Sequence, residues 1–306
     1  MAEIREITSG LRFPEGPIWM EDGSVILVEI ERGTLSRVSN DGRISVIADL
    51  GGGPNGAAIG PNGKIYVCND GGFEWHVING LLFPGLQPAN YTGGSIQVVD
   101  PETGKFEDMY RECNGNRLCG PNDIVFDKHG GLWFTDHGKN RERERDRTGV
   151  YYAKADGSMI SEVIFPIADP NGVGLSPAGD RLYVAETWTG RVWSWEVPRP
   201  GEIVAGDALG APGGGTLLVG LPGFQLLDSM AIEANGNVCV ATLVNGGISS
   251  ISPDGSVEFT PMPDPLTTNI CFGGKDLRTA YITLSGTGKL VSTPWPRPGL
   301  KLEYTG

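Results

Sequence analysis

The sequence lacks the features that mark secreted, membrane-spanning and helix-rich proteins. Its first ten residues, MAEIREITSG, contain neither the basic start nor the apolar stretch of a signal peptide. No apolar run approaches the roughly 20 residues that cross a bilayer. The chain contains 47 Gly and 22 Pro residues, which long helices do not tolerate. We therefore expect no membrane partner and little helix.

Basic charge and cysteine are also scarce. The 24 Lys and Arg residues are outnumbered by 37 Asp and Glu residues, so the formal net charge is −13. Such a chain repels phosphate backbones, which argues against a nucleic-acid partner but suits a bound cation. Five cysteines are too few, and odd in number, for a disulfide framework, which favours a cytoplasmic location. Pairing of Cys113 with Cys119 stays open.

A turn-and-strand pattern recurs along the chain. A glycine-bearing turn leads into an apolar run in EDGSVILVE (21–29), PNGKIYVCN (61–69), KHGGLWFTD (128–136), PAGDRLYVAE (177–186) and ANGNVCVAT (234–242), and more loosely in GGKDLRTAYIT (273–283). This pattern is typical of a hairpin turn followed by a strand.

One polar residue opens the short apolar segment upstream of each turn. These six residues, called the ring residues below, are Glu15, Asn55, Asn122, Asn171, Asp228 and Asn269. In the first five copies the polar residue lies eight positions before the turn glycine, and intervals of 40, 67, 49, 57 and 41 residues separate the copies. The variable intervals indicate inserts in a regular repeat.

The repeat predicts an all-β, six-bladed β-propeller with four-stranded blades. In the first copy GTLSRVS and ISVIAD follow the turn strand, which gives four strands to the unit. Six such units of roughly 40 residues predict one propeller domain over residues 1–306. The N-terminal strand 3–8 is expected to close the ring as the outer strand of the last blade, and LKLEY (300–304) is a competing candidate.

The first strand of each propeller blade lines the central channel, so the ring residues are expected to converge at one face. Carboxylates and amides, without Cys or His, suit a hard cation, Ca²⁺ first, with Mg²⁺ or Mn²⁺ as alternatives. Two carboxylates near the axis would repel each other without a cation between them. Turn propensity alone explains the Asn in PNG (54–56) and in DPNG (169–172), but not Glu15 or Asp228.

Four segments resemble, in order, the metal-bearing motifs of the SMP-30/gluconolactonase/luciferin-regenerating-enzyme family of six-bladed propellers. They are FPEGPIW (13–19), GPNDIVFD (120–127), DPNGVGLSPAGDRLYVAE (169–186) and LLDSMAI (226–232). The resemblance covers nearly the whole chain. It implies hydrolysis of lactones with a divalent metal held by Glu15, Asn171 and Asp228, and with Asn122 as a further ligand or substrate contact. Similar propellers hydrolyse organophosphates.

The chain departs from the sugar-lactone members of that family at one position. Those members are expected to have an arginine two residues before the third-blade Asn, where this chain has Gly120. The departure predicts a substrate less polar than a free sugar lactone.

The expected reaction is attack of a metal-activated water on a lactone carbonyl, with Ca²⁺, Mn²⁺, Mg²⁺ or Zn²⁺ as the metal. We predict Asp228 as the general base, with Glu15 as the alternative. A Ser-His-Asp triad is not expected, because the sequence has no G-x-S-x-G and only three histidines. His129 belongs to a turn at the opposite end of its blade.

Substrate contacts are predicted from residues at the same face. Besides the ring residues Asn55, Asn122 and Asn269, they include His137 and Trp188. The apolar insert 70–93 is expected to form a lid or pocket wall, to pack on a neighbouring blade, or to make a homodimer contact. The insert 137–148, with its RERERDR run, is expected to be solvated and self-paired.

Three functions remain in competition on the sequence. The first is a metal-dependent lactonase, and the second is a phosphotriesterase-type hydrolase that uses the same metal. The third is a non-catalytic propeller that binds a small molecule or a protein, with calcium in a structural role.

Overall fold

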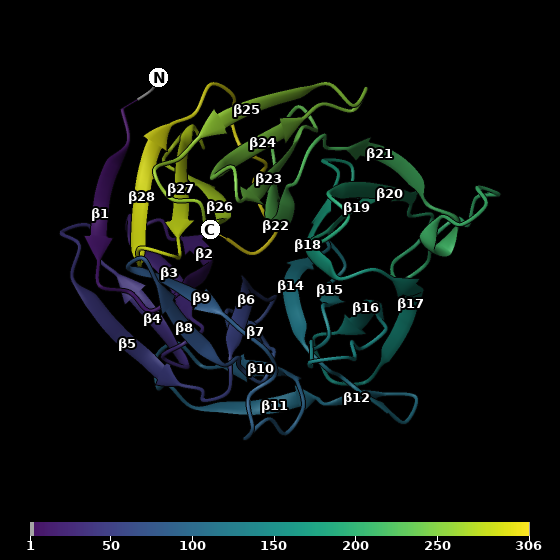
Figure 1. The fold of residues 1–306 in the computed structure, drawn as a ribbon, viewed down its shortest axis with the longest axis horizontal. Helices are drawn as coiled ribbons and strands as arrows, with labels where there is room; N and C mark the ends of the chain where they lie inside the picture. The colour runs from purple at the N-terminus through teal and green to yellow at the C-terminus, as the bar shows by residue number, and fades with distance from the viewer. Residues whose placement is uncertain (1–2, 306) are drawn as a thin grey trace.

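The computed structural model describes residues 3–305 and forms a disc of six four-stranded antiparallel sheets around a central axis (Figure 1). The predicted six-bladed β-propeller is confirmed. In each sheet the first strand is innermost and the fourth is outermost.

The blades follow one another along the chain. Blade 1 contains β2 (Pro14–Trp19), β3 (Val25–Glu29), β4 (Thr34–Val38) and β5 (Ile44–Asp49); blade 2 contains β6 (Pro54–Ile59), β7 (Ile65–Asn69), β10 (Ser95–Val99) and β11 (Phe106–Tyr110); blade 3 contains β14 (Pro121–Phe126), β15 (Gly131–Asp136), β16 (Thr148–Lys154) and β17 (Ile160–Ile167). Blade 4 contains β18 (Pro170–Leu175), β19 (Arg181–Glu186), β20 (Arg191–Glu196) and β21 (Thr216–Gly220); blade 5 contains β22 (Leu226–Ile232), β23 (Val238–Leu243), β24 (Gly247–Ile251) and β25 (Val257–Pro261).

Blade 6 joins the two ends of the chain. It contains β26 (Thr267–Gly273), β27 (Thr279–Leu284) and β28 (Lys289–Pro294), and its outer strand is β1 (Arg5–Ser9). Arg5 lies opposite Ser292 and Ser9 lies opposite Lys289. The ring is therefore closed by hydrogen bonds between β1 and β28.

The C-terminal segment 298–305 takes no part in an outer strand, so LKLEY does not close the ring. The backbone N–H of Leu300 donates to Ile232 O of blade 5 at 2.8 Å. The Tyr304 ring meets the edge of Phe126 of blade 3, with centroids 5.7 Å apart. The segment thus runs across the centre of the disc, where Figure 1 marks the C-terminus.

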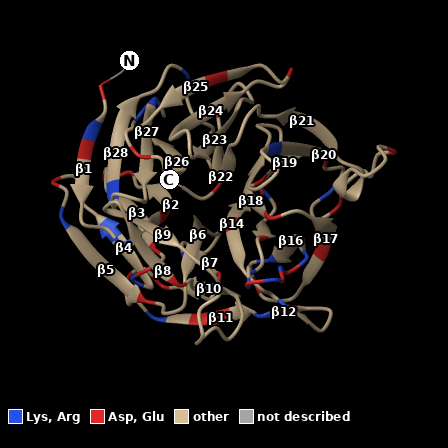
Figure 2. Cartoon of the chain, viewed as in Figure 1, with Lys and Arg blue, Asp and Glu red and all other residues tan. Residues whose placement is uncertain are grey.

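Apolar side chains fill the spaces between neighbouring blades, as the alternation of the strands requires. Blades 3 and 4, for example, bury Trp133, Val184 and Trp195 in one cluster. Figure 2 shows Lys, Arg, Asp and Glu mainly on outer strands and loops. The helical structure assigned within residues 3–305 is a 3-10 turn at Pro212–Gly214, and no helix there is long and apolar enough to cross a membrane.

The insert in blade 2 forms a hairpin, β8 (Trp75–Ile78) and β9 (Leu81–Pro84), that packs on neighbouring blades. Leu82 is buried in a cluster with Phe13, Ile30 and Leu266, which belong to blades 1 and 6 or the loops beside them. The Leu82 N–H donates to Gly286 O at 3.0 Å. The insert is therefore packed against two other blades, blades 1 and 6.

Candidate functional site

All six inner strands are irregular where the ring residues lie. The register with the second strand shifts between Glu15 and Ile18, and equivalent shifts occur in the other five blades, at 54–57, 121–124, 170–173, 227–230 and 267–269. A β-bulge re-aims the side chains beside it, and bulges are common next to active sites. The irregularity gives the ring residues an orientation that a regular strand would not.

Three glycines that follow ring residues lie against the next inner strand. A Cβ on Gly16 would come within 2.8 Å of Asn55 O, one on Gly56 within 2.4 Å of Asn122 O, and one on Gly172 within 2.7 Å of Asp228 O. These glycines lie within strands. The turn interpretation of PNG is therefore wrong, because the glycine permits close approach of two backbones.

Glu15 is buried and held by its neighbours. Its Oε2 accepts hydrogen bonds from Gly16 N at 2.8 Å and from Asn269 Nδ2 at 2.6 Å. Burial raises the pKa of Glu15 to about 7, although these hydrogen bonds oppose the shift. Its Oε1 is buried and has no hydrogen-bond partner. A carboxylate oxygen in that state needs a proton or a cation.

Asp228 lies close enough to Glu15 for the two carboxylates to affect each other. Burial and the charge of Glu15 raise the pKa of Asp228, and a hydrogen bond from Asn171 opposes the shift. Unlike Glu15, Asp228 is only half-buried. Asn171 Nδ2 also donates to Thr187 Oγ1 at 3.2 Å, which leaves its Oδ1 turned toward Ser229 at 3.5 Å.

Asn122 supplies a second unsatisfied oxygen, because its Oδ1 is buried and accepts no hydrogen bond. The structure thus leaves unpartnered oxygens on two of the four predicted ligands, beside two further ring side chains that bear oxygen. Within residues 3–305 no three His, Cys, Asp or Glu side chains gather as a metal centre. The candidate donors are therefore two carboxylates and two amides, a set that suits a hard cation.

Asn55, predicted to contact substrate, is joined to a network behind the ring. Its Nδ2 donates to Asp70 Oδ2 at 3.1 Å, and Asp70 Oδ1 accepts from Lys139 Nζ at 2.9 Å. Lys139 lies in the insert that the sequence predicted to be solvated. That expectation is wrong for Lys139, which is buried, although Arg141 pairs with Asp146 at 2.6 Å as expected.

Asp123 is a site residue that the sequence reasoning missed. It follows Asn122, where blades 1, 2 and 4 have Gly, blade 5 has Ser and blade 6 has Ile, and it is buried. Its carboxylate accepts hydrogen bonds from Ile124 N at 3.0 Å and from Val173 N at 3.1 Å. Burial and the charge of Glu15 raise the pKa of Asp123 to about 7. The signal was the exchange of Gly for Asp in an otherwise repeated motif.

His137 and Trp188 lie in second-to-third-strand loops, which belong to the face where the ring residues lie, called the ring face below. Burial, with Lys139 and Arg145 nearby, lowers the pKa of His137 to about 4, and its buried Nδ1 has no partner. Trp188 is half-exposed. Among residues 3–305, no side-chain hydrogen bond joins His137 or Trp188 to a ring residue. Cys113 and Cys119 are unpaired.

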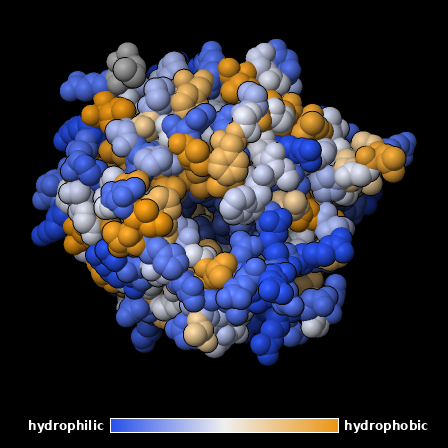
Figure 3. Space-filling model, viewed as in Figure 1, coloured by the Kyte–Doolittle hydropathy of each residue, from blue (hydrophilic) through white to orange (hydrophobic). Residues whose placement is uncertain are grey.

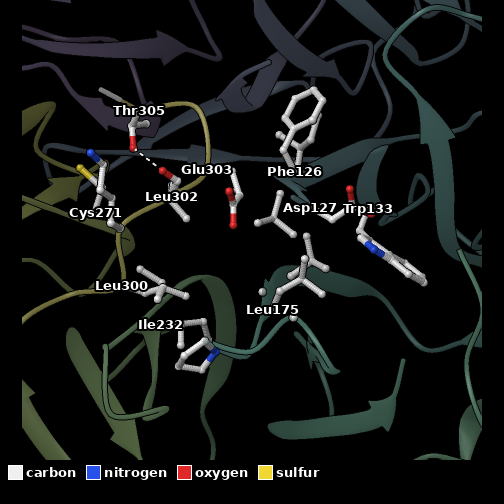
Figure 4. Close-up of a pocket in the computed structure, with 18 of the residues that line it drawn as sticks. Phe126, Asp127, Trp133, Leu175, Ile232, Cys271, Leu300, Leu302, Glu303 and Thr305 are labelled. Carbon is white, nitrogen blue, oxygen red and sulfur yellow. Dashed lines mark hydrogen bonds between the residues drawn. The ribbon is translucent and has the colours of Figure 1, made fainter. Parts of the chain in front are cut away.

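Figure 3 shows a hollow near the centre of the disc. A cavity of about 840 Å³ lies in the channel between the inner strands. Gly16, Asp123 and Asn269 of the ring region line it at one end, and it continues toward the opposite face. Figure 4 shows apolar walls from inner strands, including Phe126, Leu175 and Ile232, with Leu300 and Leu302 of the C-terminal segment beside them. His129 also lines it, as its predicted place at the opposite end of the blade requires.

Comparisons with known proteins agree with the propeller fold. Residues 13–286 match the family described as SMP-30/Gluconolactonase/LRE-like region. A gluconolactonase of Zymomonas mobilis is 27% identical, over 92% of this chain and 79% of its own. A diisopropyl-fluorophosphatase of Loligo vulgaris is 27% identical, over 67% of each chain. The solved structure of a Xanthomonas campestris gluconolactonase superposes with a TM-score of 0.75 at 20% identity, over 96% of this chain and 90% of that one.

Proposed function

The chain belongs to the SMP-30/Gluconolactonase/LRE-like family, and from this we propose that it is a metal-dependent hydrolase that opens a lactone. The observation that carries the proposal is the pair of buried, unpartnered oxygens, Glu15 Oε1 and Asn122 Oδ1. They would hold a divalent cation together with Asn171 and Asp228. Ca²⁺ is the first candidate, and Mg²⁺, Mn²⁺ and Zn²⁺ are alternatives.

When bound, such a cation polarises an ester carbonyl and activates water. The protein holds Glu15 in place through Asn269 and Gly16, so Glu15 is better suited to a fixed ligand than to a mobile base. Asp228, half-buried, is the group that takes the proton from the attacking water at a carboxylate oxygen and returns it to the departing ring oxygen. General-base catalysis of this kind contributes about 10²–10⁴-fold in rate.

The ring face favours a lactone with an apolar substituent. Trp188, Phe224 and Val244 have 50%, 67% and 46% of their surface exposed, and the tip of the β8–β9 hairpin adds Val77 at 71%. Position 120 is glycine, where an arginine is expected in sugar-lactone members of the family. A hydroxyl-rich sugar lactone would gain less from these walls than an alkyl or aryl lactone.

The test is proton release from aliphatic and sugar lactones by chelator-treated protein, with Ca²⁺, Mn²⁺, Mg²⁺ or Zn²⁺ added singly. We expect turnover to return with a cation, and Asp228→Asn to keep the wild-type melting temperature while losing at least about 10²-fold in kcat. Full activity of the Asp228→Asn variant would refute the assignment of the base.

Phosphotriester hydrolysis is the second candidate, because one relative is a diisopropyl-fluorophosphatase. The same cation and the same Asp228 would serve a phosphoryl oxygen in place of a carbonyl. Turnover of a fluorophosphate but of no lactone would select this function. Tight cation binding without either activity would select a binding propeller with structural calcium.

A further inference from the structure

A buried ion pair connects two long loops of the ring face. Lys139 Nζ donates to Asp70 Oδ1 at 2.9 Å and to Gly72 O at 2.7 Å, and the two charged side chains are 0% and 3% exposed. Nζ also lies 3.8 Å from the centroid of the Phe73 ring. Burial lowers the pKa of Lys139, and the charge of Asp70 opposes the shift. Removing two charges from water is costly, so a gain in stability does not by itself account for this buried pair.

The second oxygen of Asp70 determines which way Asn55 faces. Asp70 Oδ2 accepts a hydrogen bond from Asn55 Nδ2 at 3.1 Å. An ionised carboxylate can only accept, so it binds the NH₂ end of the amide and leaves Asn55 Oδ1 free. A neutral acid or an amide at position 70 could instead donate, and Asn55 could then turn around.

Asn55 stands between two predicted cation ligands. A Cβ on Gly16, next to Glu15, would lie 2.8 Å from Asn55 O, and one on Gly56 would lie 2.4 Å from Asn122 O. No hydrogen bond from another described residue reaches Asn55 Oδ1. This oxygen is thus an acceptor at the channel without a protein donor.

We propose that Lys139 and Asp70 are positioning residues that hold Asn55 Oδ1 as an acceptor at the ring face. Lys139 Nζ holds one oxygen of the Asp70 carboxylate, and the other oxygen of that carboxylate accepts from Asn55 Nδ2 and fixes the orientation of the Asn55 amide. The group that Asn55 receives is electron-poor, either the cation itself or a hydroxyl or water that donates a hydrogen bond. The inference rests on the proposed function.

The test uses a variant that should reverse the orientation of the Asn55 amide without leaving an unpaired buried charge. In the double variant Asp70→Asn with Lys139→Met, Gly72 N, which donates to Asp70 Oδ1 at 2.6 Å, holds the oxygen of the new amide. The new NH₂ then faces Asn55, which turns and presents its own NH₂ to the channel. Replacing both members avoids the strong destabilisation that follows when one buried charge is left without its partner. We expect the Ca²⁺ dissociation constant or the lactone KM to rise about 10–100-fold.

Adding Asn55→Asp to that double variant is the rescue. The carboxylate introduced at position 55 accepts from the new amide and again offers an oxygen to the channel, so binding should return toward the wild-type value. Lys105→Met, which removes an exposed lysine, is the matched control and should change nothing. A merely structural role of the ion pair would predict no rescue by a further change at position 55.

Calorimetric titration of Ca²⁺ into chelator-treated protein and lactone kinetics separate the outcomes. A weakened Ca²⁺ affinity that the third substitution restores assigns Asn55 to the cation, and a change confined to KM assigns it to the substrate. Unchanged binding in the double variant, or a loss without rescue, overturns the inference while leaving the proposed function intact. A wild-type chain that binds no cation and hydrolyses no lactone or phosphotriester overturns both.

Discussion

The missing side chain of Gly56 allows the inner strands β6 and β14 to lie close together. Its Cβ position lies 2.4 Å from Asn122 O, a backbone atom that cannot turn aside as a side chain could. We expect Gly56→Ala to push β6 away from β14 and to destabilise the protein by about 1–3 kcal/mol, the usual cost of overpacking. Urea unfolding measures the stability, and Ca²⁺ titration measures the effect on the ring.

Gly220→Ala is the control for that experiment. Gly220 also lies in a strand, but its nearest neighbour would be Arg191 Cγ at 3.9 Å, an ordinary contact. We expect this variant to match the wild type within about 0.5 kcal/mol. Equal stability of the two alanine variants would show that the inner strands are not closely pressed together.

His137 predicts a pH dependence of folding. Its folded-state pKa is about 4, below the ordinary value of 6.5, because it is buried near Lys139 and Arg145. Between these two values the unfolded chain binds more protons, so the contribution is complete above pH 6.5 and is lost as the pH falls toward 4. The slope is at most about 1.4 kcal/mol per pH unit.

Comparison of wild type with His137→Asn isolates that contribution from those of the acidic groups. Unfolding free energies in urea at several pH values from 4 to 7 should fall more steeply toward acid in the wild type. Parallel curves would mean that His137 is not held as the neutral imidazole.

At the scale of single residues, the sequence identifies where the ring residues lie better than it identifies which charged side chains are buried. The eight-residue spacing locates five of the six ring residues, and the looser sixth copy supplies Asn269, because a repeat reports a shared place in the fold. The repeat does not reveal Asp123, because Asp123 differs from the residues at the equivalent positions of the other copies. The sequence pattern does not predict the burial of Lys139 either, because its partner Asp70 lies 69 residues away in sequence.

The C-terminal segment is an element whose place the sequence left between alternatives. LKLEY alternates like an outer strand, but β1 occupies the only edge that blade 6 offers. Two strands of similar pattern differ only in long-range pairing, which local propensity does not decide. The sequence also left the place of the β8–β9 hairpin undecided. Leu82 of the hairpin is buried against residues of blades 1 and 6, whereas Val77 and Ile78 are exposed.

Removing residues 300–305 should open the channel cavity at the end opposite the ring face without unfolding the protein. Leu300 and Leu302 line that cavity, and the backbone hydrogen bond from Leu300 to Ile232 would be lost. We expect stronger fluorescence of an apolar dye such as anilinonaphthalene sulfonate, because more apolar surface becomes accessible. Lactone turnover and Ca²⁺ affinity should stay near the wild-type values, since the ring residues lie toward the other face. Unchanged dye binding would contradict this place for the segment.

At the scale of the whole molecule, ring closure depends on β1. Removing residues 3–9 exposes the edge of β28 and the apolar surface behind it, including buried Leu290. Because an unpaired edge strand is a site of aggregation, we expect this variant to aggregate or to melt at a much lower temperature. Differential scanning calorimetry and gel filtration measure this, and the variant without residues 300–305 is its control. Wild-type behaviour would mean that three strands suffice for blade 6.

The path of residues 298–305 has a further consequence for kinetics. The segment crosses one end of the channel, and the inner strands lie close together at Gly16, Gly56 and Gly172. We therefore expect ligands to reach and to leave the ring residues from the ring face. A ring-opened hydroxy acid that dissociates slowly would therefore block binding of the next lactone. We expect the product to inhibit competitively with the lactone.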